Sequence, residues 1–329
     1  MIAPGLHGGD GACLAASLGV TPSAVLDLSA SLNPVAPDPA EVLTAHLGAL
    51  GRYPDPAPAT EALATAIGVE PGCVLLTNGG SEAIALVAAE LGGWTAEPDF
   101  GLYPRGPSDG GPRWRSDPHN PTGRLAEPTD AAGVWDEAFY PLATGRWTAG
   151  RWTAGGDGPV VVGSLTKVFA CPGLRAGYVL SADRDLLDRA RRRQTAWSVN
   201  GLVAAALPDL LERADLPRWA ASIAALRGRL VDVLRAAGLE PEPSDANYVV
   251  VRAPGLRDGL GRHSILVRNC ANFGLPDHVR IAVPGTDGLA RLATALDALA
   301  TAPRAPRSLG PVDSAPLPRT GGLHAESLR

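Results

Sequence analysis

The chain has 329 residues, of which 45% are hydrophobic and 19% charged, and its formal net charge is −5. That much apolar sequence can bury one large core, or two smaller ones that share an interface. The acidic balance argues against nucleic-acid binding, and no apolar run is long enough to span a membrane. The four cysteines are too scattered for a zinc site or a disulfide framework. We therefore expect a cytoplasmic protein with no metal and no signal peptide.

Short β-type runs alternate with helical stretches, which is typical of an α/β fold with a largely parallel sheet. CVLLT at 73–77 predicts a buried strand, and residues 82–91 predict a helix after the turn NGGS. VVVG at 160–163 predicts a second strand, and residues 178–180 predict a third. The later predicted elements are helical at 183–209 (interrupted around 197–201), 216–238 and 287–300, and β-type at 247–252, 264–268 and 279–283.

Two segments fit no such element. GRWTA at 145–149 is repeated at once at 150–154. A five-residue unit is too short to build a repeat protein, so we expect a surface loop there. From about residue 302 onward the chain is rich in Pro, Arg, Ser and Gly, which predicts disorder.

Lys167 is the only lysine among the 29 Lys and Arg residues of the chain. It lies in SLTKVFACPGLRAGY at 164–178, at the end of a predicted buried strand. A desolvated lysine amine can lose its proton and form a Schiff base with an aldehyde, which a guanidinium cannot do. The ordinary alternative is a surface lysine in a loop.

Three other stretches favour the chemical interpretation. NGGSE at 78–82 is a glycine-rich turn before a predicted helix, where backbone N–H groups and the helix dipole can face a phosphate. NPTG at 120–123 offers an asparagine that can donate to a ring hydroxyl. DEAF at 136–139 offers an aspartate that can keep a pyridine nitrogen protonated. Each stretch is common by chance, but their order along the chain is not.

Together with RYPDP at 52–56 and PDFGLY at 98–103, these stretches resemble the fold-type I, pyridoxal-phosphate (PLP) dependent class I/II aminotransferase superfamily. The resemblance runs from about residue 7 to residue 300. Within the superfamily the sequence is similar to the branch of histidinol-phosphate aminotransferases and L-threonine-O-3-phosphate decarboxylases. That closer likeness is carried by LHGGD at 6–10, LDLSASLNP at 26–34, Phe139, ILVRNCANFGLP at 265–276 and HVRIAVP at 278–284.

The resemblance implies an aspartate aminotransferase-like fold, with a mostly parallel sheet in a large domain and a smaller α+β C-terminal domain. The implied parts are a segment covering the active site at 1–35, the PLP-binding domain at 36–205, the small domain at 206–302 and a disordered tail at 303–329. The family places a helix and two strands between positions 100 and 120. Proline and glycine are so frequent there that we expect neither a helix nor a buried strand, and hardly any strand between 123 and 136. The large sheet is therefore expected to be short of strands.

Carried over to the matching positions, the resemblance implies that Lys167 forms the Schiff base and donates a proton, while Asp136 pairs with the pyridine nitrogen. The other implied cofactor residues are Asn120 at the ring hydroxyl, Phe100 on the ring face, Gly80, Ser81, Ser164 and Arg175 at the phosphate, and Tyr53 reaching that phosphate from the partner subunit of a homodimer. Arg268 and Arg280 are implied to bind the phosphate and carboxylate of the substrate, assisted by His7 and Asn33. Two arginines in one pocket favour a doubly anionic substrate.

The resemblance implies PLP-dependent decarboxylation of a phosphorylated amino acid. The expected reaction converts L-threonine O-3-phosphate to aminopropanol phosphate in cobalamin biosynthesis. An aminotransferase of the histidinol-phosphate type would share every cofactor residue, so that alternative stays open. A degenerate, non-catalytic paralogue also stays open, since the shortened intervals favour it and the intact Lys167 segment argues against it.

Overall fold

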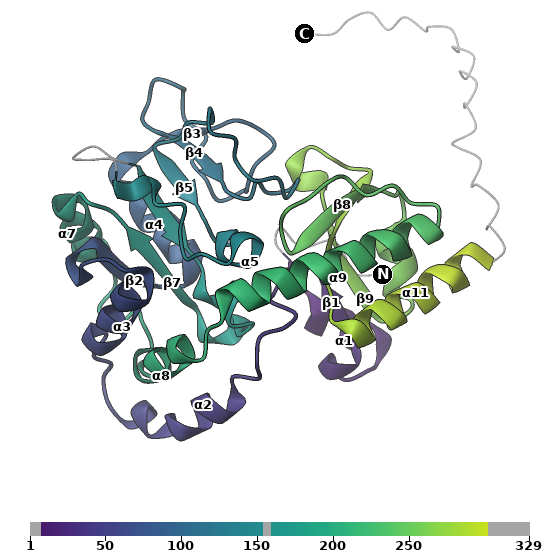
Figure 1. The fold of residues 1–329 in the computed structure, drawn as a ribbon, viewed down its shortest axis with the longest axis horizontal. Helices are drawn as coiled ribbons and strands as arrows, with labels where there is room; N and C mark the ends of the chain where they lie inside the picture. The colour runs from purple at the N-terminus through teal and green to yellow at the C-terminus, as the bar shows by residue number, and fades with distance from the viewer. Residues whose placement is uncertain (1–7, 154–158, 302–329) are drawn as a thin grey trace, which may run out of the picture.

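The computed structural model of the protein describes residues 8–153 and 159–301. Its α-helices are α1 Gly11–Leu18, α2 Ala40–Ala45, α3 Ala57–Ile67, α4 Gly79–Leu91, α5 Tyr140–Thr144, α6 Leu165–Val168, α7 Arg184–Arg193, α8 Gly201–Glu212, α9 Leu216–Ala236, α10 Leu256–Gly261 and α11 Thr286–Thr301. Its strands are β1 Leu26–Leu28, β2 Val74–Asn78, β3 Trp94–Thr95, β4 Arg113–Ser116, β5 Val134–Asp136, β6 Val160–Gly163, β7 Ala176–Leu180, β8 Tyr248–Arg252, β9 Ile265–Asn269 and β10 His278–Ala282. A larger and a smaller sheet occupy opposite ends of the molecule, and α9 begins beside α5 next to the larger sheet and extends along the smaller one (Figure 1).

The larger sheet has six strands in the order β2-β7-β6-β5-β4-β3. β7 pairs antiparallel with both of its neighbours, while the β6–β5, β5–β4 and β4–β3 pairs are parallel. All strands of this sheet except β7 therefore run in one direction, and their carboxyl ends meet at one edge. In open α/β sheets, ligands bind at that edge.

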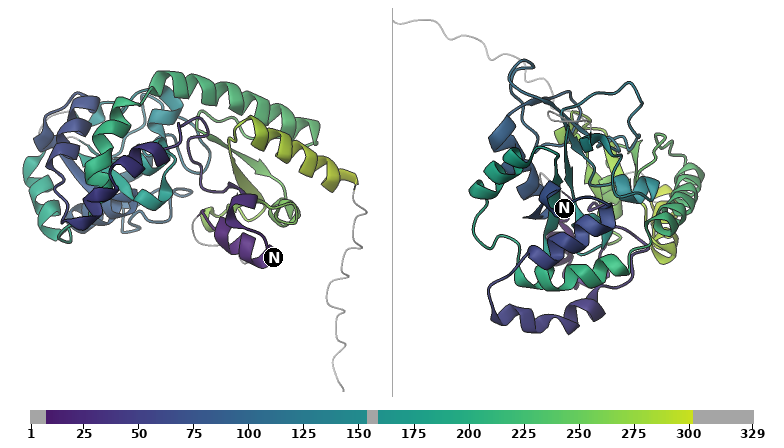
Figure 2. Two further views of the ribbon diagram at one scale, coloured as in Figure 1. Left: turned by 90° about the horizontal axis from the view of Figure 1, so that it is seen from below. Right: turned by 60° about the vertical axis from the view of Figure 1, so that its left-hand side comes forward.

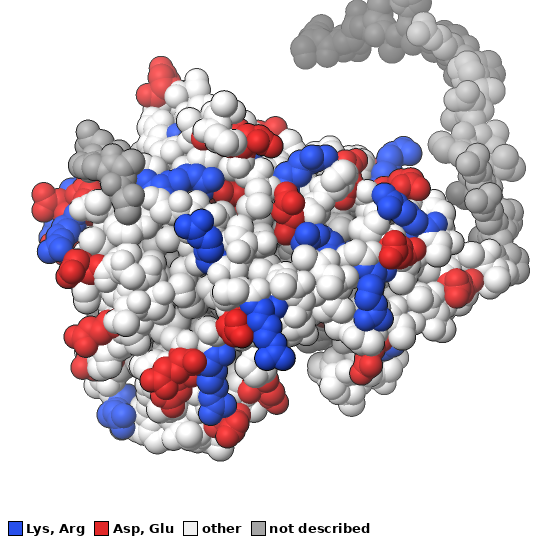
Figure 3. Space-filling model, in the orientation of Figure 1, with Lys and Arg blue, Asp and Glu red and all other residues white. Residues whose placement is uncertain are grey.

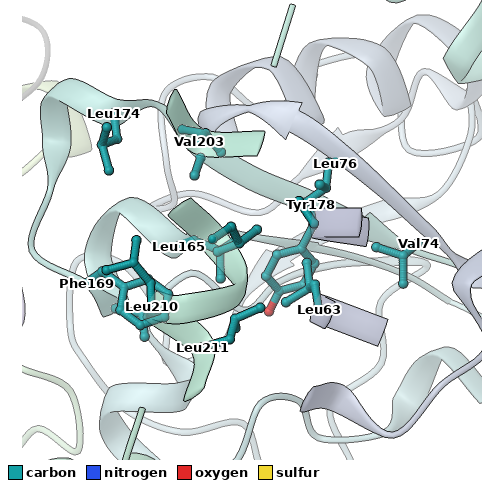
Figure 4. Packing of buried hydrophobic residues seen from close by; sticks show 14 of the residues in the cluster. Leu63, Val74, Leu76, Leu165, Phe169, Leu174, Tyr178, Val203, Leu210 and Leu211 are labelled. Atoms are coloured by element: carbon teal, nitrogen blue, oxygen red, sulfur yellow. The ribbon is translucent and has the colours of Figure 1, made fainter. Parts of the chain in front are cut away.

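Both faces of the larger sheet are covered, by α3 and α8 on one side and by α4 and α7 on the other. Residues of β2 alternate between the two faces: Val74 and Leu76 pack with Leu63 of α3, and Leu75 packs beneath α4. Figure 4 shows the first of these two clusters, with Tyr178 at its centre. Burial on both faces favours continuously apolar strands, and this explains why CVLLT and VVVG are recognisable in the sequence.

The expectation that residues 101–119 contain no buried strand is wrong. β4 lies there and pairs in parallel with both β3 and β5. Its sequence RWRS alternates, with Trp114 and Ser116 buried and the two arginines partly exposed. Four residues suffice because the strands on either side supply the hydrogen bonds. Residues 101–133, all of which are described, contain no helix, so loops connect β4 to its neighbours.

The smaller sheet has four strands in the order β1-β9-β10-β8 and packs against α9 and α11. β1 pairs in parallel with β9, so a strand from the N-terminal region joins the C-terminal part of the chain. The antiparallel register of β9 and β10 places Arg268 opposite Arg280. The predicted domain boundary at 205/206 falls within α8, and the division into domains stays a prediction.

The GRWTA copies do not form the expected surface loop. Trp147 and Trp152 are partly buried against the same cluster as Leu63. Arg151 forms an ion pair with Asp117, whose side chain is only 1% exposed. The second copy is therefore integrated into the large part of the molecule, although residues 154–158 lie outside the described ranges.

Charges of both signs are interspersed over the face seen in Figure 3. Figure 2 shows from two further directions how α9 extends alongside the region between the two sheets. None of the helices within the described ranges is both long and apolar enough to cross a membrane. The predicted disorder after residue 302 concerns residues outside those ranges.

Candidate active site

A cavity of about 510 Å³ lies at the carboxyl edge of the larger sheet and is also lined by residues of the smaller sheet. Its size is in the range of small-molecule sites. It brings together these sequence-predicted residues: Gly80, Ser81, Phe100, Asn120, Asp136, Ser164, Lys167, Arg175, Arg268 and Arg280. Within this set of predicted residues, the first and the last, Gly80 and Arg280, are 200 positions apart in the chain and yet line one space.

The glycine-rich turn forms the beginning of α4, three residues earlier than predicted, directly after β2. Gly79 has φ +75°, and a Cβ there would lie 2.5 Å from Nη2 of Arg175. Only glycine allows the turn to approach the guanidinium this closely. The N-terminus of a 13-residue helix, Ser81, Ser164 and Arg175 thus surround one corner of the cavity. Backbone N–H groups, hydroxyls and a guanidinium are what a phosphate monoester requires, so this corner fits the phosphate of PLP.

Lys167 lies in α6, the short helix directly after β6. Its Nζ donates a hydrogen bond to the carbonyl oxygen of Ala30 over 2.7 Å. Burial, reinforced by the charges of Arg280 and Arg175, lowers the pKa of Lys167 to about 8. About one amine in ten is then neutral at pH 7, a far larger fraction than for an exposed lysine. A partly deprotonated amine beside a phosphate-binding corner suits covalent attachment of an aldehyde.

Asp136 ends β5 and is held by two hydrogen bonds. Its Oδ2 accepts from the hydroxyl of Tyr103 over 2.7 Å, and its Oδ1 accepts from the N–H of Ala138 over 2.9 Å. Burial raises the pKa of Asp136 to about 6. A carboxyl in this state is suited to sharing a proton with a ring nitrogen bound beside it. Tyr103 was not predicted as a site residue, although it lies in the PDFGLY motif, three residues after Phe100.

Asn120, in the loop after β4, links the larger sheet's carboxyl edge to β10 of the smaller sheet. Its Oδ1 accepts a hydrogen bond from Nη1 of Arg280 over 2.6 Å. A guanidinium only donates, so this contact fixes the amide orientation and leaves the NH₂ group to donate elsewhere. The N–H of Asn120 donates to Oγ of Ser116, which in turn donates to Asp99, a buried carboxyl whose pKa is raised to about 6 by burial.

Arg268 and Arg280 stand opposite each other on neighbouring strands of the smaller sheet. Like charges in that position repel, and burial lowers the pKa of both side chains. Arg280 is 6% exposed and forms no ion pair with a carboxylate in the described part of the chain, where its Nε also lacks a hydrogen-bond partner. A buried guanidinium with an unused donor suits an anionic ligand.

Two predicted residues that the structure describes, Tyr53 and Asn33, do not line this cavity. Tyr53 is 75% exposed and stacks on Trp197, with 4.4 Å between ring centroids. Asn33 is buried, donates to the carbonyl of Val168 and accepts from the N–H of Val35, so its amide supports the backbone rather than facing the cavity. His7 lies outside the described residues. Conversely, Asp27 and Ser29 of the motif LDLSASLNP line the cavity without having been predicted.

The family model described as aminotransferase class I and II matches residues 116–299, more than half of the chain. The chain belongs to this family, whose members are enzymes that use PLP. The predicted superfamily, fold and cofactor are therefore confirmed.

Individual relatives differ in their activities. The chain is 31% identical to the threonine-phosphate decarboxylase of Salmonella typhimurium, over 88% of this chain and 95% of that protein. It is 29% identical to a histidinol-phosphate aminotransferase of Methylococcus capsulatus, over 83% and 90% of the two chains. The structure of a histidinol-phosphate aminotransferase from Sinorhizobium meliloti in complex with pyridoxal-5'-phosphate has a TM-score of 0.73 and 19% identity, covering 91% of this chain and 95% of that one. At that identity the likeness concerns the fold.

Proposed function

We propose that the protein is a PLP-dependent decarboxylase of a phosphorylated amino acid. Its substrate would be L-threonine O-3-phosphate and its product aminopropanol phosphate, which serves cobalamin biosynthesis. The observation that carries the proposal is the opposed pair Arg268 and Arg280 on the wall of the cavity that holds Lys167. Two buried guanidinium groups favour a ligand with two anionic groups. The likeness to the Salmonella decarboxylase supports the same choice.

The cofactor would be held by residues that the geometry already groups. Gly80, Ser81, Ser164 and Arg175 would bind its phosphate, and Lys167 would attach to its aldehyde. Phe100 would lie on the ring face, while the amide NH₂ of Asn120 would donate to the ring hydroxyl. When bound, PLP supplies an aldehyde for covalent attachment and a ring that accepts electrons from the substrate Cα.

Proton movements would fall to two side chains. Asp136 would hold a proton at the pyridine nitrogen, with Tyr103 fixing the orientation of the carboxylate. Lys167, with a pKa of about 8, would deliver a proton to the substrate Cα after the carboxylate has left. Arg268 and Arg280 would position the substrate so that the bond to its carboxylate breaks.

The test of the function is a choice between two reactions. Purified holoenzyme given L-threonine O-3-phosphate is expected to release CO₂ and aminopropanol phosphate without any added keto acid. L-Threonine, which lacks the phosphate, is expected to react about 10²-fold more slowly or worse, because a buried guanidinium would lose its partner.

The second candidate is an aminotransferase of the histidinol-phosphate type, favoured by the likeness to the Methylococcus enzyme. Both candidates would use the same cofactor residues. Amino transfer from a phosphorylated substrate to a keto acid, with no CO₂ release, would overturn the decarboxylase proposal and support this one.

We also propose a homodimer in which Tyr53 of the partner subunit reaches the phosphate corner. Leu47, Leu50, Tyr53 and Trp197 are between 49% and 75% exposed, an unusual set of large apolar side chains to leave in water. Tyr53 does not line the cavity of its own chain. A second copy covering these residues would bury the apolar side chains and complete the site.

Mixing two inactive variants tests shared sites. Tyr53→Ala and Lys167→Ala chains, unfolded and refolded together, are expected to regain about a quarter of wild-type activity, since one site in each mixed dimer is intact. Activity is measured as CO₂ release, with each variant refolded alone as the control. If the mixture stays as inactive as its components while forming dimers, Tyr53 does not act across an interface.

A further inference from the structure

Two buried carboxylates lie beside the cavity without belonging to it. The side chain of Asp117 is 1% exposed and that of Glu137 is 0% exposed. Asp117 directly follows β4 and precedes Asn120 by three residues, while Glu137 directly follows Asp136 at the end of β5. The backbones of the two strand ends are joined, since the N–H of Asp117 donates to the carbonyl of Asp136 over 2.8 Å. Buried charges at such a position require a partner.

Arg151 supplies that partner. Its Nη1 lies 2.6 Å from Oδ2 of Asp117 and 3.4 Å from Oε1 of Glu137. The guanidinium also lies over the ring of Trp135, 4.0 Å from the centroid. Arg151 therefore contacts the residues immediately before and after Asp136. Because side chains alternate along a strand, these contacts are on the opposite side of β5 from the cavity.

Arg151 belongs to the second GRWTA copy, and the arginine of the first copy does not form the equivalent ion pairs. Arg146 occupies the equivalent place in the first copy and is exposed. Arg151 is 26% exposed on its side chain and bridges two carboxylates. The arginines of the identical pentapeptides thus lie in different environments, and of the two only Arg151 bridges Asp117 and Glu137.

Residues of both GRWTA copies surround the buried carboxyl of Glu137. Burial raises the pKa of Glu137 to about 7, and the negative charge of Asp117 adds to this rise. The rise is opposed by hydrogen bonds from Thr148 and Ala149 and by the positive charge of Arg151. Thr148 and Ala149 belong to the first GRWTA copy. Both copies therefore meet at the same carboxylate, one through hydrogen bonds and the other through a cation.

We propose that Arg151 is a positioning residue, which ties the segment carrying Asn120 to the segment carrying Asp136 and so holds both in place for the cofactor. The loops of residues 101–133 contain no helix that could brace these strand ends. Instead, the guanidinium of Arg151 contacts the residue after β4, Asp117, and the residue after β5, Glu137. This inference rests on the proposed cofactor roles of Asn120 and Asp136.

The test compares PLP binding by three variants of the full-length protein. Arg151→Gln is expected to weaken PLP binding by about tenfold or more, the scale on which small misplacements in a site act. Arg151→Lys keeps one cation and is expected to recover part of the affinity. Arg146→Gln, the matched change in the identical pentapeptide, is expected to bind PLP as the wild type does. Affinity is measured by absorbance titration of the apoprotein, and near-UV circular dichroism of the bound cofactor reports its orientation.

A triple variant separates positioning from folding. Arg151→Gln leaves two buried carboxylates unpaired and can lower the melting temperature by itself. Combining it with Asp117→Asn and Glu137→Gln removes those charges, and we expect a melting temperature close to that of the wild type with PLP binding still weak and the dichroism altered. Wild-type affinity and dichroism in this folded triple variant, or in Arg151→Gln itself, would overturn the proposal. If the wild-type protein binds PLP but releases no CO₂, while Arg151→Gln binds PLP weakly, the proposed reaction is overturned and the role of Arg151 stands.

Discussion

Replacing Lys167 by arginine is expected to abolish catalysis while leaving the fold intact. Arginine keeps the positive charge and can still donate to the carbonyl of Ala30, which accepts from Nζ over 2.7 Å. It cannot attach to an aldehyde or deliver a proton at neutral pH. The rate of CO₂ release is expected to fall by about 10³-fold or more, because attachment and proton transfer are lost together.

The covalent link can be measured directly. Borohydride reduction of the holoenzyme is expected to fix PLP to the peptide that contains Lys167, and Lys167→Arg is expected to yield no fixed label. The result is unambiguous because no other lysine side chain exists in the 329 residues. A label of undiminished yield in the variant would contradict the role of Lys167.

From the lowered pKa of Lys167 we expect the rate of cofactor uptake to depend on pH. Lys167 has a pKa lowered to about 8, mainly by burial. The neutral amine is the nucleophile, so uptake of PLP by the apoprotein is expected to accelerate as the pH rises from 6 to 8 and to level off above. Stopped-flow absorbance follows this directly, and a rate that is flat across this range would contradict a titrating amine.

Asp136→Asn is expected to have the second largest effect, lowering kcat by about 10² to 10⁴-fold. Asparagine cannot carry the charge that keeps a ring nitrogen protonated, so the bound ring accepts electrons less readily. The phosphate corner is untouched, and PLP is still expected to bind. The control is Tyr103→Phe, which removes one hydrogen bond to the carboxylate and is expected to cost only about tenfold. Equal losses in the two variants would contradict the assigned role of Asp136.

The pH dependence of protein stability provides an independent test of the raised pKa of Asp136. The pKa of Asp136 is raised to about 6 in the fold, mainly by burial. Between its unfolded and folded pKa values the folded state binds more protons, so this group lowers the free energy of unfolding as the pH rises through that window. The apoprotein of Asp136→Asn is therefore expected to be more stable than the wild-type apoprotein at pH 8. Thermal unfolding monitored at pH 5 and pH 8 tests this.

The residues of the cavity were predictable where they belong to short motifs at the ends of apolar strands. Lys167 and the start of α4 follow β6 and β2, and Arg175 directly precedes β7; these strands are buried on both faces and therefore recognisable from sequence alone. β4 was not predictable, because RWRS is short, charged and stabilised by neighbouring strands rather than by its own propensity. Propensity is a weak guide when tertiary pairing supplies the hydrogen bonds.

Contacts between segments that are distant in the chain also limit how well site residues can be predicted from sequence. Asn33 looks like a site residue in its motif, but its amide donates to the carbonyl of Val168 and accepts from the N–H of Val35, so backbone groups use both ends of it. Tyr103 and Arg151 show the reverse, because their importance arises from carboxylates 33 and 34 positions away in the chain. No pattern of local spacing contains those pairings.

The hydrogen bond between Arg280 and Asn120 has a consequence for any attempt to redesign this enzyme. It joins a proposed substrate-binding side chain on β10 to a proposed cofactor-orienting amide in the loop that follows β4 of the larger sheet. Replacing Arg280 to admit an uncharged substrate would also release the amide of Asn120, which could then rotate. Substrate choice and cofactor chemistry are therefore not independent design variables in this protein, and a change of specificity would have to supply a new donor for Oδ1 of Asn120.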